Sequence, residues 1–297
     1  MRRRQFVSNA LWFAAGSGLV AACGDRGGLS GINHNLDALR FSVTDVKGIE
    51  PLEKDFGEFY RALGEAIALP IEPVPLDSFV AAAPALLNKQ MDLVLAGPSE
   101  YLLLNARARA VPIVAITRPG YRTKMVTLAD SGLKTLKDLK GKAVGMRTEG
   151  STAGHIGASQ LIADAGLDPV QDITVKMPGD RGLTALLSGE IDAWADSASR
   201  IDRFIGNVDG ALDKVVTLVE GPPLPNDVFV ASSSLDSAFL KALEETMVSQ
   251  QEKLLTALLQ SPENSKYAKS TLVPAMDSDY DQVRTMYQTL GLDALIQ

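Results

Sequence analysis

The sequence is poor in several features that mark large classes of proteins. It has one cysteine, so no disulfide can form within the chain, and it has only two histidines. Aromatic residues make up 6% of the chain, and 36 acidic residues against 29 basic ones give a formal net charge of -7. Nucleic-acid-binding proteins usually show a basic surplus and aromatic side chains on which bases stack. The composition therefore predicts no nucleic-acid partner.

Motifs of common catalytic and metal sites are also missing. The sequence contains neither a Gly-x-x-x-x-Gly-Lys-[Ser/Thr] loop nor a Gly-x-Ser-x-Gly elbow. His34 and His155 lie far apart along the chain, and the only thiol, Cys23, has a different expected use. No zinc site of the usual spacing is present. No paired acid and base stand at a readable spacing, so we expect no cofactor, no metal and no enzymatic activity.

What the chain does have is the composition of an ordinary globular protein. Its 297 residues are 46% hydrophobic and 22% charged, which excludes a disordered, collagen-like or coiled-coil chain. At about 100 to 200 residues per domain, this length predicts two lobes.

The first 22 residues have the pattern of an export signal. Arg2, Arg3 and Arg4 precede an apolar stretch over 10–22, which is too short to cross a bilayer as a helix, since that takes about 20 residues. The stretch ends in Leu-Val-Ala-Ala before Cys23, which resembles a bacterial lipobox. We therefore predict a signal peptide over 1–22, lipidation of Cys23, and anchoring of the protein to a membrane in the periplasm or cell envelope.

Two alternatives for this segment stay open at the level of sequence. A plain secretory signal with a chance cysteine would also fit the pattern. The run Arg3 to Val7 is similar to a twin-arginine signal, which would mean folding before export. No residue after Cys23 decides between the inner and the outer membrane. Residues 23–37 are rich in glycine and predict a flexible tether.

The rest of the chain alternates between short apolar segments and amphipathic ones. Apolar runs with β-branched residues predict strands, and apolar residues at helical spacing predict helices. Such alternation is typical of an α/β fold in which helices connect the strands of mainly parallel sheets. Strands are predicted at 39–44, 71–74, 91–96, 143–146, 173–177, 191–195, 215–219 and 227–231. Helices are predicted at 56–63, 79–87, from 99, at 151–165 and 182–187, from 198, and at 235–259 and 280–290.

A weak internal repeat predicts two related lobes. Residues 85–92 match residues 185–192 at an offset of 100, and a serine follows each copy, Ser99 and Ser199. Each copy predicts a helix, a turn, an aspartate and an apolar strand. In open α/β sheets, ligands bind beyond the carboxyl ends of the strands, so two such lobes would hold a ligand in a cleft between them.

Breaks in the pattern place the two connections between the lobes. The segment Thr117–Gly120 is one candidate, and a segment with three prolines, Pro222, Pro223 and Pro225, is the other. Lobe one is then expected to comprise 38–117 and 226–297, and lobe two 118–225.

Two predicted helix starts have the chemistry of an anion site. The segment Gly145–His155 places small, hydroxyl-rich residues between a strand and a helix, and Ser151 is in position to cap that helix. The N–H groups of its first turn and the Thr152 hydroxyl would then point outward. Gly97–Tyr101 offers a similar helix start in lobe one. A helix N-terminus attracts an anion without any lysine, although a single one is usually just a helix cap.

At these segments the sequence resembles a known family, the periplasmic phosphate-, phosphite- and phosphonate-binding proteins of ABC importers. The resemblance implies the type II periplasmic-binding-protein fold, two lobes joined by a hinge, and an oxyanion held by helix N-termini and hydroxyls. It runs in order over about residues 38 to 205. The matching segments are Asp92–Tyr101, Leu136–Val144, Gly150–His155 and Ala165–Pro169.

The resemblance also implies a set of ligand-binding residues. They are Ser99 and Tyr101 in lobe one, and Ser151, Thr152 and Ala153 in lobe two.

Three further residues are candidates, and the sequence departs from the family pattern at the first two of them. Arg181 lies where the family often has a histidine, and we expect it either to clamp the oxyanion or to be a solvated surface residue. Asp196 would need a ligand donor beside it, such as a protonated phosphate oxygen or an ammonium group. His155 lies one turn after Ser151, and either a place at the edge of the site or a structural role is expected.

The sequence thus predicts a lipid-anchored solute-binding protein of an ABC importer. Its ligand would be a small phosphorus oxyanion, namely phosphonate, phosphite or phosphate, and its partner an inner-membrane permease. A monomer is expected. The acidic net charge does not oppose this, because exposed charges are screened beyond about 8 Å whereas N–H groups act at contact. The alternatives are a sulfonate, carboxylate or heterocyclic ligand, a sensor kinase as partner, and, more remotely, a small-molecule lyase on the same fold.

Overall fold

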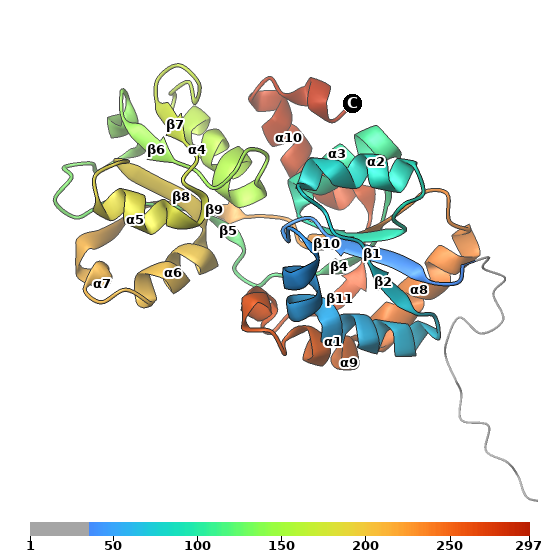
Figure 1. Ribbon diagram of the computed structural model, residues 1–297. Coiled ribbons are helices and arrows are strands. Elements are labelled where there is room, and N and C mark those ends of the chain that lie inside the picture. The colour runs from blue at the N-terminus through green and yellow to red at the C-terminus, as the bar shows by residue number, and fades with distance from the viewer. Residues whose placement is uncertain (1–35) are drawn as a thin grey trace, which may run out of the picture.

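The computed structural model of the chain describes residues 36–297 (Figure 1), so the predicted signal peptide, Cys23 and nearly all of the tether lie outside the described residues. The described strands form two separate sheets, one of six strands and one of five. We call the six-stranded sheet with its helices lobe one and the five-stranded sheet with its helices lobe two. The chain passes to lobe two after Ile116 and returns before Asp227.

The sheet of lobe one combines parallel and antiparallel strands. Its order is β11 (Leu272–Pro274), β4 (Val111–Ile116), β10 (Asp227–Ala231), β3 (Leu93–Ala96), β1 (Leu39–Val43), β2 (Ile71–Pro73). β1 pairs in parallel with β2 and β3, whereas β10 is antiparallel to both β3 and β4. β11 is antiparallel to β4 at the edge of the sheet.

The sheet of lobe two follows the same plan. Its order is β7 (Thr174–Lys176), β6 (Ala143–Gly145), β8 (Ala193–Ser197), β5 (Arg122–Leu128), β9 (Val215–Pro223). β6 pairs in parallel with β7 and β8, and β5 is antiparallel to β8 and β9. Both sheets are therefore mixed, but most strands in each run in the same direction, as expected of mainly parallel sheets. A strand that enters a lobe directly from a short crossing, without a helix between, runs opposite to its neighbours.

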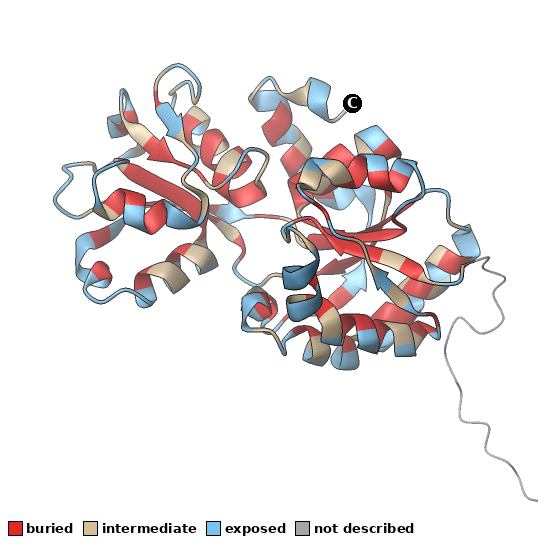
Figure 2. Ribbon diagram, viewed as in Figure 1, coloured by how far each residue is buried: buried red, intermediate tan, exposed pale blue. Residues whose placement is uncertain are grey.

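Helices cover both faces of each sheet, so the central strands β1, β3, β8 and β10 are almost wholly buried, whereas the edge strands β2, β7, β9 and β11 are partly exposed (Figure 2). In lobe one, one face packs on α1, α8 and α9, and the other on α2, α3 and α10. In lobe two, α5, α6 and α7 cover one face and α4 the other. The α-helices are α1 (Ile49–Ile67), α2 (Ala82–Leu87), α3 (Pro98–Ala108), α4 (Ala158–Asp164), α5 (Gly182–Leu187), α6 (Ala198–Gly206), α7 (Ala211–Lys214), α8 (Ser237–Ser249), α9 (Gln251–Leu258) and α10 (Asp281–Thr289).

Shorter helical turns precede several of these helices. A π-helix over Thr152–Gly157 leads into α4, where the sequence predicted one continuous helix. The predicted helix 235–259 is divided at Gln250 into α8 and α9. The 3-10 helices are Phe79–Ala81, Leu136–Leu139, Gly179–Arg181, Pro262–Tyr267, Asp277–Tyr280 and Asp293–Leu295.

The two copies of the internal repeat have the same local structure. Each copy is a helix, α2 or α5, followed by a tight turn and a buried strand, β3 or β8. In lobe one, Asp92 accepts a hydrogen bond from the backbone N–H of Arg40 at 2.9 Å. In lobe two, Asp192 accepts the same bond from Ala143 at 2.8 Å. Each aspartate therefore fixes the start of the neighbouring parallel strand, which explains why it recurs at this offset.

The turn of the repeat yields a stability prediction. Its central residue has a left-handed backbone in both copies, with φ of 56° at Lys89 and 72° at Gly189. This conformation costs a non-glycine residue about 1 kcal/mol. Lys89→Gly is expected to raise the free energy of unfolding by about 0.5–1 kcal/mol, and Gly189→Ala to lower it by about 1 kcal/mol. Urea denaturation followed by circular dichroism measures both changes. A loss of stability in Lys89→Gly would contradict the prediction.

Candidate ligand-binding site

Charged and polar residues gather where the parallel strands of the two lobes end. Asp45 follows β1, and Ser99 and Glu100 follow β3. On lobe two, Arg147 follows β6 and Asp196 lies near the end of β8. With Thr152, these residues form a set that we call the interlobe polar cluster. Its position agrees with the rule that ligands of α/β sheets bind beyond the carboxyl ends of the strands.

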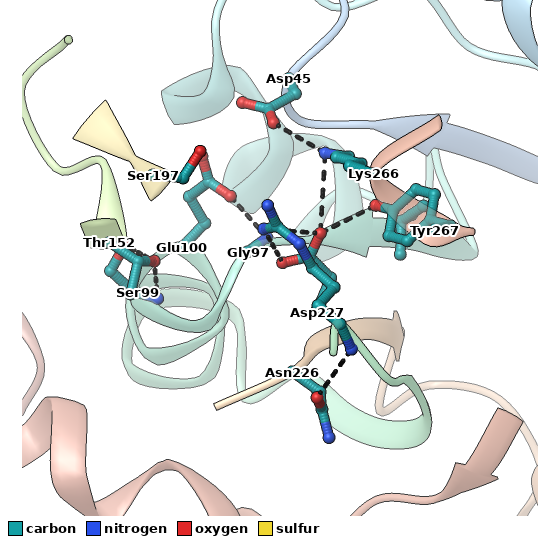
Figure 3. A network of polar contacts seen from close by, with 12 residues as sticks. Asp45, Gly97, Ser99, Glu100, Thr152, Ser197, Asn226, Asp227, Lys266 and Tyr267 are labelled. Carbon is teal, nitrogen blue, oxygen red and sulfur yellow. Dashed lines mark hydrogen bonds and ion pairs between the residues drawn. The ribbon is translucent and has the colours of Figure 1, made fainter. Parts of the chain in front are cut away.

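The two helix starts predicted to bind an anion contact each other directly (Figure 3). The backbone N–H of Ser99 donates to Oγ1 of Thr152 at 3.0 Å, and the two hydroxyl oxygens are 2.8 Å apart. The Ser99 hydroxyl also donates to the carbonyl oxygen of Gly150 at 2.5 Å. Ser99 and Thr152 are both buried. Sequence reasoning thus named two residues, from different lobes, that the fold brings into contact.

The details at these helix starts differ from the expected ones. The Ser151 side chain forms no cap hydrogen bond, and the Ser151 carbonyl oxygen accepts hydrogen bonds from the backbone N–H groups of His155 and Ile156 in the π-helix. The Thr152 hydroxyl does not point outward but faces Ser99. The N–H and hydroxyl groups that were expected to bind an anion therefore partly form hydrogen bonds with each other.

Glu100 places its own carboxyl group at the N-terminus of α3. Its Oε2 accepts hydrogen bonds from the backbone N–H of Gly97 at 2.6 Å and from the Thr44 hydroxyl at 3.0 Å. Burial, and secondly the charge of Asp45, raises the pKa of Glu100 to about 7. The sequence patterns did not single out the Glu100 carboxyl group, although a glutamate three residues after a cap residue signals one at a helix N-terminus.

Two arginines bring positive charge to the cluster from lobe two. Arg147 Nη2 lies 3.6 Å from a carboxylate oxygen of Asp45 on lobe one. Arg200 Nε lies 3.1 Å from a carboxylate oxygen of Asp196, whose side chain is 1% exposed. Burial raises the pKa of Asp196, and the charges of Arg147 and Arg200 oppose that rise. Hydrogen-bond donors that can hold an anion and carboxylates that can accept a proton thus lie side by side at the interlobe polar cluster.

The other residues implied by the family resemblance lie around this cluster rather than in it. The Tyr101 hydroxyl donates to Asp277 of the C-terminal segment. Ala153 is buried in an apolar cluster with Tyr101, and its carbonyl accepts a hydrogen bond from Thr123. His155 accepts a hydrogen bond from the backbone N–H of Gly150 at 3.1 Å. Because Gly150 carries the carbonyl that Ser99 binds, His155 supports the loop of the site.

The structure does not bring Arg181 to the cluster. Its side chain is 67% exposed, and its nearest carboxylate is Glu190 of the same lobe at 3.8 Å. Arg181 is therefore a solvated surface residue, which was the second of its two expected roles. The arginine beside Asp196 is Arg200, which the i, i+4 spacing of the two residues could have indicated.

A buried ion pair fixes the connection between the lobes. Arg118, on the first crossing, donates to Asp227 at 3.0 Å, and their side chains are 9% and 4% exposed. The Tyr267 hydroxyl donates to the same carboxylate at 2.8 Å, and Asn226 accepts from the Arg118 backbone N–H at 3.1 Å (Figure 3). Both crossings are thus held to lobe one beside the cluster, a feature that the sequence did not reveal.

Comparison with known proteins decides the family. A family model described as "ABC transporter, phosphonate, periplasmic substrate-binding protein" matches residues 41–280. The chain belongs to this family. It is thus a periplasmic component that binds a small ligand for an ABC transporter and works with a permease, and it is not an enzyme.

Solved structures show the same fold at low sequence identity. PhnD1 from Prochlorococcus marinus, in complex with methylphosphonate, matches with a TM-score of 0.72 at 17% identity, over 86% of this chain and 99% of the other. A binding protein component of an ABC phosphonate transporter from Pseudomonas aeruginosa matches at 0.68 and 15%, over 88% and 89%. The aliphatic sulphonate binding protein SsuA from Escherichia coli matches at 0.60 and 18%, over 88% of each chain. These matches confirm the type II periplasmic-binding-protein fold.

No helix within residues 36–297 is long and apolar enough to span a membrane. In the same range, no three histidine, cysteine, aspartate or glutamate side chains are grouped in a way that would hold a metal ion.

The raised pKa of Glu100 predicts a pH effect on stability. The folded protein keeps the Glu100 proton up to about pH 7, whereas the ordinary pKa of a glutamate carboxyl is 4.5, so stability falls as pH rises between these values. Glu100→Gln removes this fall. Between about pH 4 and pH 8, the free energy of unfolding of the variant should therefore gain about 2 kcal/mol relative to that of the wild type. Urea denaturation at several pH values measures the difference. Identical pH profiles would contradict the assignment.

A matched control is Glu65→Gln. Glu65 is exposed on α1, and a hydrogen bond from Lys253 lowers its pKa. This variant should therefore not reproduce the gain at neutral pH.

Proposed function

We propose that the protein binds a phosphorus oxyanion, namely phosphonate, phosphite or phosphate, in a cleft between its lobes and passes it to an ABC permease. The observation that carries the proposal is the contact of Ser99 with Thr152, where two helix starts from different lobes meet. Helix N-termini and hydroxyls bind oxyanions through short hydrogen bonds. Arg147 adds a full positive charge from lobe two.

The carboxylates of the cluster favour phosphorus over sulfur. A phosphonate or phosphate monoanion retains a proton that it can donate to a carboxylate, whereas a sulfonate retains none. Asp196 and Glu100, both with raised pKa values, are suited to such a shared proton. A ligand ammonium group would satisfy them equally well. The fold similarity to a sulphonate-binding protein keeps a sulfonate as the second candidate.

The arrangement also supports a closing mechanism. A ligand that touches Ser99 on lobe one and Thr152 or Arg147 on lobe two gains all its contacts only when the lobes are together. Such a ligand shifts the equilibrium toward the closed form by its difference in affinity for the two forms. The two crossings, held to lobe one by Arg118 and Asp227, would act as the hinge.

We further propose that lobe one comprises 38–117 and 226–297, lobe two comprises 118–225, and the protein acts as a monomer. The distribution of strands between the two sheets supports these boundaries. Lipid anchoring through Cys23, after removal of residues 1–22, completes the proposal and rests on the sequence pattern alone.

Lipid anchoring is tested by the Cys23→Ser variant. The wild-type protein is expected in the membrane fraction, because an acylated N-terminus partitions into the bilayer. The variant should move to the soluble periplasmic fraction, as fractionation and immunoblotting would show. Equal distribution of the two proteins would contradict lipidation.

Ligand binding is tested on the soluble Cys23→Ser protein by thermal shift and calorimetry. The ligands are methylphosphonate, phosphite, phosphate, aminoethylphosphonate, sulfate and methanesulfonate. A ligand at about 100 times its Kd adds about 2.7 kcal/mol of stability. We expect such a gain for at least one phosphorus compound and a smaller one for both sulfur compounds. Preference for methanesulfonate would favour the second candidate instead.

Arg147→Gln locates the site, with Arg181→Gln as its matched control. Both variants remove one arginine charge from lobe two, but only Arg147 lies in the interlobe polar cluster. Loss of one charged hydrogen-bond donor costs about 1.5–3 kcal/mol, so Arg147→Gln should weaken binding by about tenfold or more. Arg181→Gln should bind like wild type. Equal effects of the two substitutions would place the ligand elsewhere.

A further inference from the structure

Asp45 is the carboxylate of lobe one that meets an arginine of lobe two. It lies in the turn after β1, with its side chain 39% exposed. Arg147 Nη2 approaches it to 3.6 Å from the other lobe, and Lys266 Nζ to 3.3 Å from its own lobe. Figure 3 shows Asp45 directed toward Lys266 at the upper edge of the polar network. The ion pair with Arg147 therefore crosses between the lobes.

This ion pair is built differently from the ion pair at the hinge. Arg118 and Asp227 are almost wholly buried and joined by hydrogen bonds, so breaking them would leave a charge without solvent or partner. The Asp45 and Arg147 side chains are 39% and 25% exposed, and their 3.6 Å separation is longer than an ordinary hydrogen bond. Partly exposed pairs of this kind contribute little to stability. The ion pair of Asp45 with Arg147 is thus suited to an exchange in which a ligand anion takes the place of Asp45.

If a ligand anion replaced Asp45 as the partner of Arg147, Asp45 would still have Lys266 as a partner. Lys266 contacts Asp45 at 3.3 Å and Asp227 at 3.6 Å, so it joins the cluster to the hinge. The charge of Arg147, and secondly that of Lys266, lowers the pKa of Asp45, which stays ionised at neutral pH. When Arg147 turns to another anion, Lys266 still compensates Asp45. No uncompensated charge results from the exchange.

Arg147 faces other acidic groups besides Asp45. The charges of Asp196, Glu100 and Asp180 all act on it, and together with Asp45 they raise its pKa. Asp196 and Asp180 also contact Arg200 within lobe two. Asp45 alone brings a permanent negative charge to Arg147 from across the lobe boundary at ion-pair distance.

We infer that Asp45 is a positioning and specificity residue that holds Arg147 in the unliganded protein and yields it to the ligand anion on binding. The inference rests on the proposed function. Before binding, Asp45 takes the place of the ligand's charge and keeps Arg147 at the lobe boundary. After binding, it remains beside the ligand as a negative charge. A ligand that retains a proton tolerates this charge, whereas a fully deprotonated dianion is repelled.

The charge-removing variants Asp45→Asn and Asp45→Ser test the inference through the sign of their effect. Titration calorimetry at about pH 6 uses methylphosphonate, which retains a proton there, and sulfate, which does not. Loss of the competing charge should tighten methylphosphonate binding by about threefold and sulfate binding by about tenfold, so selectivity falls. Damage to a purely structural residue would weaken both. Asp45→Glu should restore the selectivity of the wild type.

Glu65→Gln is the charge control, because it removes one negative charge from the surface that α1 shares with α9. It should leave both affinities unchanged. Weaker or unchanged binding of both anions by the Asp45 variants, while the wild type binds methylphosphonate, would overturn the inference and leave the proposed function standing. If the wild type bound neither a phosphorus nor a sulfur oxyanion, the proposed function would fall and the inference with it.

Discussion

The contact between Ser99 and Thr152 is the interaction on which the rest of the site depends. Each residue begins a helix after a parallel strand, and each strand belongs to a different sheet. Their hydrogen bonds join the two lobes at the point where two helix N-termini meet. Partial positive charge from both helices is therefore concentrated there. A negatively charged ligand at this point would stabilise both helix ends and the junction of the lobes at once.

Charge compensation is the second constraint on the structure. Arg147 of the interlobe polar cluster pairs with Asp45, and Arg200 beside the cluster pairs with Asp196. Such pairing compensates each charge in the absence of a ligand, including that of the buried Asp196. It also means that an anion has to compete with carboxylates that are already present. Affinity for an oxyanion then depends on a proton or a positive group on the ligand, which is a means of choosing among chemically similar anions.

Sequence patterns predicted most of the strands and helices. They also placed Ser99 and Thr152 at helix starts of different lobes, which the structure brings into contact. They did not predict β4, β5 or β11, because Pro112 and Pro274 read as strand breakers and β5 alternates with charged residues. Nor could they pair Asp45 with Arg147, since that contact depends on how the lobes face each other. The motif region favoured Arg181, although Arg147 directly follows the predicted strand 143–146 and Arg200 lies four residues after Asp196.

A crystal structure of the protein soaked or grown with methylphosphonate tests the central claim most directly. The claim predicts phosphonate oxygens within hydrogen-bond distance of the Ser99 N–H group and of the Thr152 hydroxyl, with the direct bond between these two residues replaced. It also predicts a guanidinium of lobe two on the same anion. A phosphonate bound away from Ser99 and Thr152, with their hydrogen bond intact, would contradict the claim.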